Sequence, residues 1–347
     1  MKKYPSIDQF RNVIRAVKTN HDYQGKDEND QAIYQHTSPY PTLTFNGTVK
    51  IHGTNAAIVR YKDGTTKFQS RERELELTSD NMGFKLFMSN VDLDFLFAGI
   101  KFNDHIAVYG EWCGKGIQKG VAVSELPRMF VIFGWKIDDV WVSNIIRHNN
   151  ECGIWDIRQF PTYQIKIDFN NPEQVQNEII DLTIAVENEC PVGKQMGVCG
   201  VGEGIVFSTE YNGHRYVFKS VGKKHSPSNR TTLASVDVDE LNSINEFVTY
   251  ALTENRLNQG IDIMKSNDIV VSEKTTGAFL KWVADDIIKE ETDTIVQNGL
   301  DVKKIMKAVS NKARVWYFNY LNDDVIDFNK LEKTASKLYN QHIKAAE

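Results

Sequence analysis

The stretch Thr48-Val-Lys-Ile-His-Gly-Thr-Asn55 decides how the rest of this chain is interpreted. It closes an apolar, β-branched segment, Thr42–His52, which predicts a strand. Lys50 stands at the end of that strand, just before the glycine turn at Gly53, where the backbone can bend sharply beneath a ligand. A lysine held in a pocket can lose its proton and act as a nucleophile. An isolated lysine at a strand end is more often exposed, so the indication rests on the whole string.

Length and composition narrow the class of protein. The chain has 347 residues, of which 41% are hydrophobic and 25% are charged, as in an ordinary globular protein. This length predicts two domains with a sizeable core. The longest apolar stretch, Met129–Trp135, is too short to span a bilayer, and the first ten residues lack the apolar segment of a signal peptide. The four cysteines form no CxxC pair, which favours a reducing cytoplasm.

The net charge of −5 argues mildly against a nucleic-acid-binding protein, but the distribution of the charge matters more than its sum. The segment from His214 to Arg230 contains no Asp or Glu. Its basic residues are Arg215, Lys219, Lys223, Lys224 and Arg230. This basic strip is either a local phosphate-binding surface or a solvated loop.

The first two-thirds of the chain are predicted to be rich in β-strands. The expected strands are Thr42–His52, Ala56–Tyr61, Lys67–Ser70, His105–Trp112, Met129–Ile137, Val140–Val142, Ile205–Ser208 and Arg215–Ser220. Hairpin turns are expected at Asp63-Gly64, Asp138-Asp139 and Asn212-Gly213. Helices are expected at Ser6–Lys18, Met82–Asn90 and Pro172–Glu187.

After about Ser228 the pattern becomes helical. The expected helices are Val236–Asn258, Gly277–Thr292, Val302–Leu321 and Phe328–Ala345. The polar stretch Ser226–Thr232 is the expected domain boundary. The sequence therefore predicts an α+β protein with a mixed domain over residues 1–232 and a small all-helical domain over residues 236–347.

Six segments occur in an order that is hard to reach by chance, although each is weak alone. They are Lys50-Ile-His-Gly-Thr-Asn55, Ser70-Arg-Glu-Arg73, Tyr109-Gly-Glu-Trp-Cys-Gly-Lys-Gly-Ile-Gln-Lys119, Phe130-Val-Ile-Phe-Gly-Trp135, Glu203-Gly-Ile-Val-Phe207 and Tyr216-Val-Phe-Lys219. In these segments the sequence resembles the covalent nucleotidyltransferases, which comprise ATP-dependent DNA and RNA ligases and mRNA capping enzymes. It is most similar to the bacteriophage RNA ligase 2 family, which includes the trypanosome RNA-editing ligases.

This resemblance implies a reaction and a fold. The first domain would be an adenylyltransferase domain with an ATP-grasp-like antiparallel sheet. Lys50 would attack the α-phosphate of ATP and expel pyrophosphate, so that AMP becomes covalently attached to Lys50. AMP would then move to a 5′-phosphate on RNA, and a 3′-hydroxyl would displace it. Burial, a nearby cation and a bound metal each favour the neutral amine that this attack needs.

The resemblance also assigns roles to residues around the nucleotide. Lys219 is expected to contact the α-phosphate and to be the cation near Lys50. Arg71 and Glu111 are expected to hold the ribose, because a carboxylate accepts hydrogen bonds from ribose hydroxyls. Phe133 is expected to stack on adenine, although an aromatic residue in a strand is by itself more often part of the core.

Glu203 matches the glutamate that places a divalent metal, Mg²⁺ or Mn²⁺. Magnesium is usually held by few carboxylates together with phosphates and water, so no dedicated metal cage is expected. Val49 and Ile51 flank the nucleophile in the expected nucleotide site, and Asn55 is expected to hold phosphate or the loop. His52 is assigned to steps after adenylylation, although a lone histidine is more often structural.

The sequence departs from the family pattern in two places. The last segment commonly reads Lys-x-Lys, but here Lys219 is followed by Ser220 and Val221. Lys223 or Lys224 would then supply the second phosphate contact from the adjacent turn. The segment that begins at Glu203 also lacks its usual trailing lysine.

The leading hypothesis is an ATP-dependent RNA ligase that repairs nicked duplex RNA, with the helical domain gripping the nick. A monomer in the cytoplasm is the default, in the host cell if the source is a virus of bacteria. An ATP-dependent DNA ligase is a second hypothesis, but such enzymes usually carry an OB-fold where this chain is helical. A catalytically idle nucleic-acid-binding protein is a third hypothesis, which the intact Lys50, Glu111, Glu203 and Lys219 disfavour.

Overall fold

The computed structural model describes residues 1–229, 234–237 and 239–322. The chain divides into two compact units. The first unit spans Met1–Ser226 together with the described residues between 234 and 239, and the second contains Pro227–Asn229 and the described residues from 240 onward. The predicted helix Phe328–Ala345 lies outside the described residues. No described helix is both long enough and apolar enough to cross a membrane.

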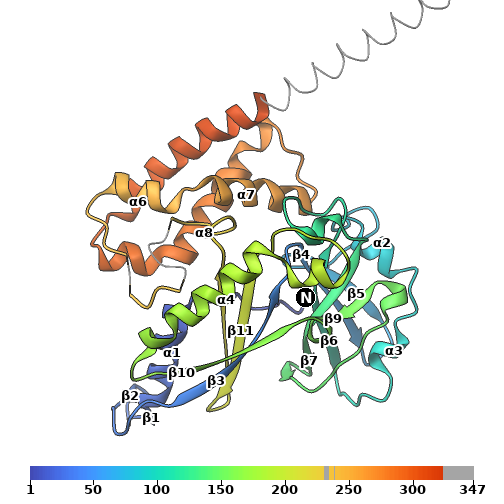
Figure 1. The fold of residues 1–347 in the computed structure, drawn as a ribbon, viewed down its shortest axis with the longest axis horizontal. Coiled ribbons are helices and arrows are strands. Elements are labelled where there is room, and N and C mark those ends of the chain that lie inside the picture. Colours follow the sequence, from blue (N-terminus) through green and yellow to red (C-terminus); the bar gives the residue numbers. More distant parts are fainter. Residues whose placement is uncertain (230–233, 238, 323–347) are drawn as a thin grey trace, which may run out of the picture. The chain divides into compact units, whose positions relative to one another are not determined.

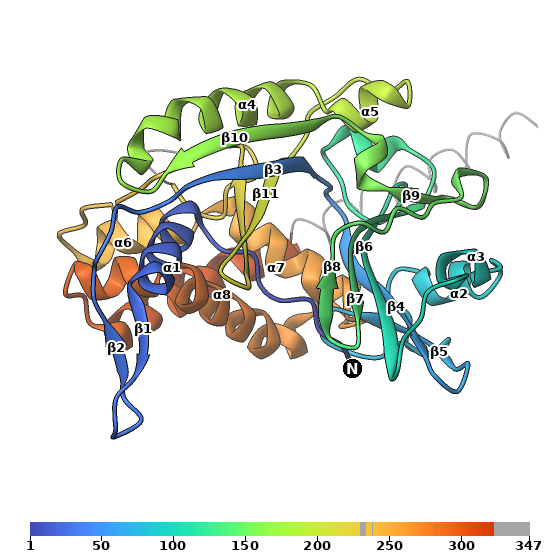
Figure 2. The ribbon, with the colours of Figure 1, turned by 90° about the horizontal axis from the view of Figure 1, so that it is seen from below.

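The first unit contains a four-stranded antiparallel sheet, which Figures 1 and 2 show in two orientations. Its order is β10-β3-β11-β12, so the strand that carries the Lys50 motif is central. The strands are β3 (Thr42–Lys50), β10 (Thr162–Asp168), β11 (Gly204–Tyr211) and β12 (His214–Val221).

A second sheet in the same unit has the order β5-β4-β6-β7-β8, and β9 adds to β7 in parallel. Its strands are β4 (Thr54–Tyr61), β5 (Thr66–Ser70), β6 (His105–Cys113), β7 (Met129–Ile137), β8 (Val140–Val142) and β9 (Ile154–Asp156). A separate hairpin pairs β1 (Tyr23–Lys26) with β2 (Ala32–Tyr34).

The two faces of the four-stranded sheet have different environments. Phe45, Phe207 and Phe218 are fully buried on one face. The helix α4 (Gln176–Asn188) covers part of this face, where its Thr183 hydroxyl lies 2.7 Å from Ser220 Oγ. Since side chains alternate along a strand, the neighbouring positions project from the opposite face, and these include Lys50.

Helices and short helical turns complete the first unit. α1 (Phe10–Asp22) packs on β12 through the ring of Phe10, 4.9 Å from that of Phe218. α2 (Phe84–Met88) and α3 (Asp94–Phe97) contribute buried side chains to the core of the second sheet. The remaining elements are η1 (Ala122–Glu125), η2 (Asn150–Cys152), η3 (Ile157–Gln159), η4 (Pro172–Val175) and α5 (Pro191–Gln195).

The second unit, as far as the structure describes it, is built from helices. They are α6 (Ile244–Ala251), α7 (Glu254–Ser266), the short η5 (Glu273–Thr275), α8 (Thr276–Gln297) and a final helical stretch over residues 302–322. One predicted helix, Val236–Asn258, is two helices in the structure. Thr253 causes the break, because its hydroxyl accepts a hydrogen bond from the Arg256 amide and begins a new helix.

A buried charge cluster stabilises this second unit. The guanidinium of Arg256 is fully buried, and its Nε donates to Asp286 Oδ2 at 2.8 Å. Glu291 is also fully buried and accepts a hydrogen bond from the Tyr250 hydroxyl at 3.0 Å. Buried charges persist in proteins only when they are paired in this way.

The predicted secondary structure is confirmed for most strands of the first unit. The turn at Asn212-Gly213 has positive φ at both residues, 47° and 74°, as a two-residue hairpin requires. The strand β10 and the β1–β2 hairpin were not predicted. β10 carries Lys166 between two buried isoleucines, so its exposed half is strongly polar.

We expect Gly47→Val to destabilise the first unit. Gly47 lies opposite Phe207 in the β3–β11 register, and a Cβ atom there would lie 2.7 Å from the Phe207 ring. Because Phe207 is fully buried, its ring has no space into which to move. Overpacking of this kind costs about 2 kcal/mol of unfolding free energy, which urea denaturation followed by tryptophan fluorescence would measure. Asn46→Val, at the exposed neighbouring position, is the control, and equal stability of the two variants would contradict this account.

Candidate active site

The Lys50 motif lies where the chain passes from one sheet to the other. β3 ends at Lys50 and β4 begins at Thr54, so three residues join the two sheets. Gly53 approaches β6 so closely that a Cβ atom would lie 2.3 Å from the carbonyl oxygen of Trp112. Close packing of two backbones therefore requires a glycine at this position, a reason that the sequence alone did not indicate.

Lys50 and Glu203 form an ion pair across neighbouring strands. Lys50 is opposite Gly204 in the β3–β11 register, and Glu203 directly precedes that glycine. Lys50 Nζ donates to Glu203 Oε1 at 2.6 Å. The lysine side chain keeps 22% of its surface exposed, whereas Glu203 keeps only 6%. The lysine side chain is therefore partly open to solvent, whereas the glutamate side chain is almost fully covered.

Gly204 makes this arrangement possible. Its φ of +155° is unfavourable for other residues, and a Cβ atom there would lie 2.1 Å from the carbonyl oxygen of Ser220. The Glu-Gly pair of the motif thus has a structural cause as well as a chemical one.

His52 completes the environment of the Glu203 carboxylate. Its Nδ1 lies 3.3 Å from Glu203 Oε2, so the two carboxylate oxygens face two different partners. Burial would raise the pKa of Glu203, but the charge of Lys50 and the hydrogen bond with His52 outweigh burial and hold that pKa well below its usual range. Glu203 is therefore ionised at neutral pH.

Glu111 is a second carboxylate at the same site. It lies opposite Asn55 in the β4–β6 register, so the two side chains share one face of the second sheet. Desolvation raises the pKa of Glu111 from 4.5 to about 7, although the charge of Lys50 acts in the opposite direction. Lys50, Glu203, His52 and Glu111 thus form one electrostatic group.

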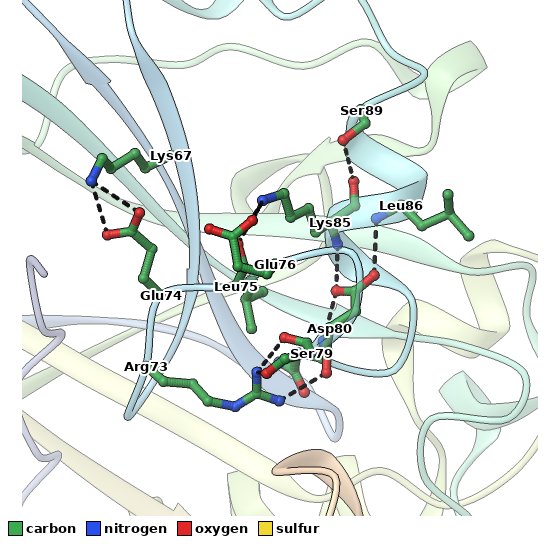
Figure 3. A network of polar contacts seen from close by, with 11 residues as sticks. Lys67, Arg73, Glu74, Leu75, Glu76, Ser79, Asp80, Lys85, Leu86 and Ser89 are labelled. Atoms are coloured by element: carbon green, nitrogen blue, oxygen red, sulfur yellow. Dashed lines mark hydrogen bonds and ion pairs between the residues drawn. The ribbon is translucent and has the colours of Figure 1, made fainter.

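Arg71 follows β5 and is close enough to lower the pKa of Glu111. The loop that follows it is held by the polar network shown in Figure 3. The Arg73 guanidinium donates to the carbonyl oxygens of Ser79 and Asp80. The Asp80 carboxylate in turn accepts from the Lys85 amide at 2.7 Å. Because this loop is held by hydrogen bonds, the backbone at Arg71 has a fixed position beside the site.

The apolar residues assigned to the nucleotide site have mixed positions. Val49 and Ile51 are 2% and 5% exposed and belong to the core, so their side chains are not available to a ligand. Phe133 is half-buried on β7, and the edge of its ring meets that of Tyr4 with centroids 5.0 Å apart. Its place in the core accounts for the aromatic residue even without a ligand.

Lys219 stands on the same face of the sheet as Lys50. The registers pair Lys50 with Gly204 and Gly204 with Val221, and Lys219 is two residues from Val221. Paired residues and residues two apart in a strand project from one face. Its backbone amide donates to Asp8, which covers the outer edge of β12.

The remaining members of the basic strip differ in environment. Lys223 and Lys224 are exposed in the turn after β12, where the Lys224 amide donates to Glu187 Oε1 at 2.6 Å. Arg215 places its guanidinium over the ring of Trp141, 4.4 Å from the centroid. Arg230 lies outside the described residues.

The sequence analysis missed His225, which the structure brings to this group. Its ring lies 5.5 Å from that of His52, between centroids. Its Nε2 is buried, and no hydrogen-bond partner for it exists within the part of the chain that the structure describes. Burial lowers the pKa of His225. No motif marks this residue, and its only sequence signal is its place directly after Lys223 and Lys224.

A divalent metal fits the donor set at this site. Glu203 is the buried carboxylate that would hold it, with substrate phosphates as the further ligands, which is the usual arrangement for magnesium. When bound, the metal neutralises negative charge on phosphate oxygens.

Residues 44–221 match the family described as RNA ligase, and they make up 178 of the 347 residues. The chain belongs to the RNA ligase family. The comparison with curated proteins finds no match.

Among solved structures, members of this family from Naegleria gruberi are similar to the chain. One is the Naegleria gruberi RNA ligase with PPi, at 19% identity and a TM-score of 0.41. Another is a mutant of that ligase with AMP and Mn, at 18% identity and a TM-score of 0.42. Each match covers 65% of this chain and 56% of the other, so this chain spans just over half the length of the Naegleria ligase.

We expect Glu111→Gln to change how stability depends on pH. Between pH 4.5 and about 7 the unfolded chain has released the Glu111 proton while the folded chain retains it. A rise in pH therefore favours unfolding of the wild type over this interval, by as much as about 3 kcal/mol, and glutamine removes the effect. Melting temperatures of both proteins from pH 4.5 to 8.5 would show the variant gaining relative stability up to about pH 7 and no further. Glu210→Gln, at an exposed position of β11, is the control, and parallel curves for the wild type and Glu111→Gln would contradict the assignment.

Proposed function

We propose that this chain is an ATP-dependent RNA ligase that joins 3′-hydroxyl and 5′-phosphate ends at nicks in duplex RNA. The reaction would proceed through AMP linked covalently to Lys50 and then through adenylylated RNA. The observation that carries this proposal is the 2.6 Å contact of the partly exposed Lys50 amine with the buried Glu203 carboxylate. Membership of the RNA ligase family supports it independently.

The ion pair explains how Lys50 is held before reaction. An ammonium is not a nucleophile, so the amine must lose a proton before its nitrogen can bond to the α-phosphorus of ATP. In that step the Nζ–P bond forms, the bond from α-phosphorus to the bridging oxygen breaks, and pyrophosphate leaves. Glu203, whose pKa is held low, is a poor acceptor for this proton, which would pass to water at the exposed side of Lys50, and the carboxylate would serve to aim the Nζ atom.

Other residues would bind the nucleotide around Lys50. Glu111 and Arg71 would hold the ribose, and the electrostatic effect of both Lys50 and Arg71 on Glu111 supports this assignment. Lys219 projects from the same face as Lys50 and would contact the α-phosphate, whose negative charge pairs with an ammonium. Phe133 remains the proposed contact for adenine.

The remaining functional proposals concern the nucleic acid. The exposed Lys223 and Lys224 would contact the phosphate backbone, which gives affinity without sequence information. The helical unit would engage the duplex around the nick. We further propose that the chain belongs to the phage-type RNA ligase 2 branch, that it repairs RNA, and that it acts as a cytoplasmic monomer.

Strand preference separates this proposal from the DNA ligase hypothesis. The experiment compares sealing of two nicked duplexes that differ only in the strand carrying the 3′-hydroxyl, which is RNA in one and DNA in the other. The proposal expects faster sealing of the RNA strand, because the enzyme must sense a 2′-hydroxyl near the reacting end. Preference for an all-DNA nick would remove the RNA ligase assignment.

We expect Lys50→Ala to abolish self-adenylylation. The wild type, incubated with magnesium and ATP labelled at the α-phosphate, should retain label on the denatured chain, and the variant should show background only. Lys166→Ala is the control, because Lys166 is an exposed lysine on β10 of the same sheet. Full labelling of the Lys50 variant would refute the proposed nucleophile, and absence of labelling in the wild type would favour an idle nucleotidyltransferase fold.

A further inference from the structure

A group of metal-ligating side chains lies far from Lys50, around the β1–β2 hairpin. His21 and Asp22 are the last residues of α1, and β1 begins immediately after them. The hairpin then returns the chain to its starting point, where the Gln35 amide donates to the Asp22 carbonyl oxygen at 2.7 Å. This closure brings His36 beside Asp22. Figure 2 shows the hairpin extending alongside α1.

The three side chains present a compact donor set. His36 Nδ1 and Asp22 Oδ1 are 2.9 Å apart. One donor atom from each of His21, Asp22 and His36 can be chosen so that all three lie within 4.8 Å of one another. Among the residues that the structure describes, no other group of histidine, cysteine and carboxylate side chains satisfies this criterion.

Neighbouring hydroxyl groups orient these donors. The Tyr40 hydroxyl donates to Asp22 Oδ2 at 3.1 Å, which leaves Oδ1 directed toward His36. His21 Nδ1 lies 2.9 Å from the Tyr211 hydroxyl, and its Nε2 lies 3.1 Å from Ser38 Oγ. Whichever nitrogen of His21 binds a metal, the other keeps a hydrogen-bonding partner. Metal-binding histidines are oriented in this way by a second layer of polar groups.

We propose that His21, Asp22 and His36 form a binding site for a divalent transition-metal ion of the Zn²⁺ type, with water as the fourth ligand. Two imidazoles and one carboxylate are a donor set that Zn²⁺ accepts in tetrahedral geometry. Metal–donor bonds of about 2.1 Å place tetrahedral donors about 3.4 Å apart. The present separation of 2.9 Å between His36 and Asp22 needs only a small opening to reach that value.

The position of the site favours a cation for a second reason. His21 and Asp22 stand in the last turn of α1, a helix of 13 residues. The carbonyl end of a helix carries partial negative charge and stabilises cations placed there. The exposed His36, half of whose side-chain surface is accessible, gives an entering ion a path to the site.

The site is separate from the proposed active site and does not depend on it. Tyr40 lies two residues before the start of β3, whereas Lys50 is at the far end of the same strand. Eight residues of extended strand span about 26 Å. A bound ion would join the end of α1, the close of the hairpin and the approach to β3, so its role would be to stabilise this part of the first unit.

Zinc binding by the full chain tests the proposal. The protein is stripped with a chelator, and Zn²⁺ binding is measured by competition with a chromophoric chelator, with Co²⁺ absorption spectra as a second readout. We expect one equivalent at this site, at least about tenfold weaker binding in His36→Ala and Asp22→Asn, and a Zn²⁺-dependent rise in melting temperature that both variants lack.

Two control variants separate this site from others. His148→Ala removes an exposed histidine elsewhere and should bind Zn²⁺ as the wild type does. Glu203→Gln should also retain Zn²⁺ binding at His21, Asp22 and His36, because this substitution would remove only metal held at the proposed active site. If His36→Ala and Asp22→Asn bind Zn²⁺ as tightly as the wild type, or if the wild type binds none at micromolar concentrations, the group is a hydrogen-bonded cluster only and the proposal fails.

Discussion

The close approach of the Ile51–Gly53 crossing to β6 is the constraint on which the site depends. Three residues carry the chain from one sheet to another. At Gly53 the backbone passes so close to the carbonyl oxygen of Trp112 that a Cβ atom would not fit. The buried side chain of Ile51 fixes the other end of the crossing in the core. Lys50 and Asn55 are therefore held on either side of a segment that has little freedom to move. A reactive amine must be carried by a rigid backbone if its position is to be defined.

The charges gathered around this crossing are costly to bury, and their arrangement shows how the fold offsets the cost. Glu203 is almost inaccessible, yet it remains ionised because Lys50 and His52 each engage one of its oxygens. Among the described residues, only longer-range charges act on Glu111, so desolvation dominates and its pKa rises. Two carboxylates of the same residue type thus acquire opposite shifts from their surroundings. An added cation or ligand hydroxyl would therefore stabilise the Glu111 carboxylate more than the Glu203 carboxylate. This behaviour is expected of a binding site rather than of a structural ion pair.

Much of the first unit could be predicted from the sequence, because alternating residues and turn pairs such as Asn212-Gly213 act locally. The strand β10 alternates exposed polar and buried apolar residues, a local strand signal that the sequence analysis overlooked. Its pairing with β3, at a separation of more than a hundred residues, could not be predicted from local sequence. The ordered segments indicated Lys50 and Glu203 as candidates for one site, and the structure brings their side chains together, but nothing in the segments indicated the 2.6 Å contact. His225 could not be found at all, since its proximity to His52 arises only from tertiary folding.

The valine at position 221 now has a structural context. Val221, Gly204 and Lys50 form one row across three strands, so the side chain at 221 projects from the face that carries Lys50. Valine cannot donate a side-chain hydrogen bond to phosphate, so this position cannot supply a second phosphate contact in the proposed reaction. Lys223 and Lys224 are exposed in that turn, whereas His225 directs a buried imidazole beside His52. The buried Nε2 of His225 has no partner among the described residues. A hydrogen bond to an anionic ligand would therefore stabilise His225 more than it would stabilise a lysine ammonium that water already solvates. Val221 and His225 thus lie at the two ends of the short segment that follows the Lys219 position, and of the two only His225 offers a polar side chain to the group around His52.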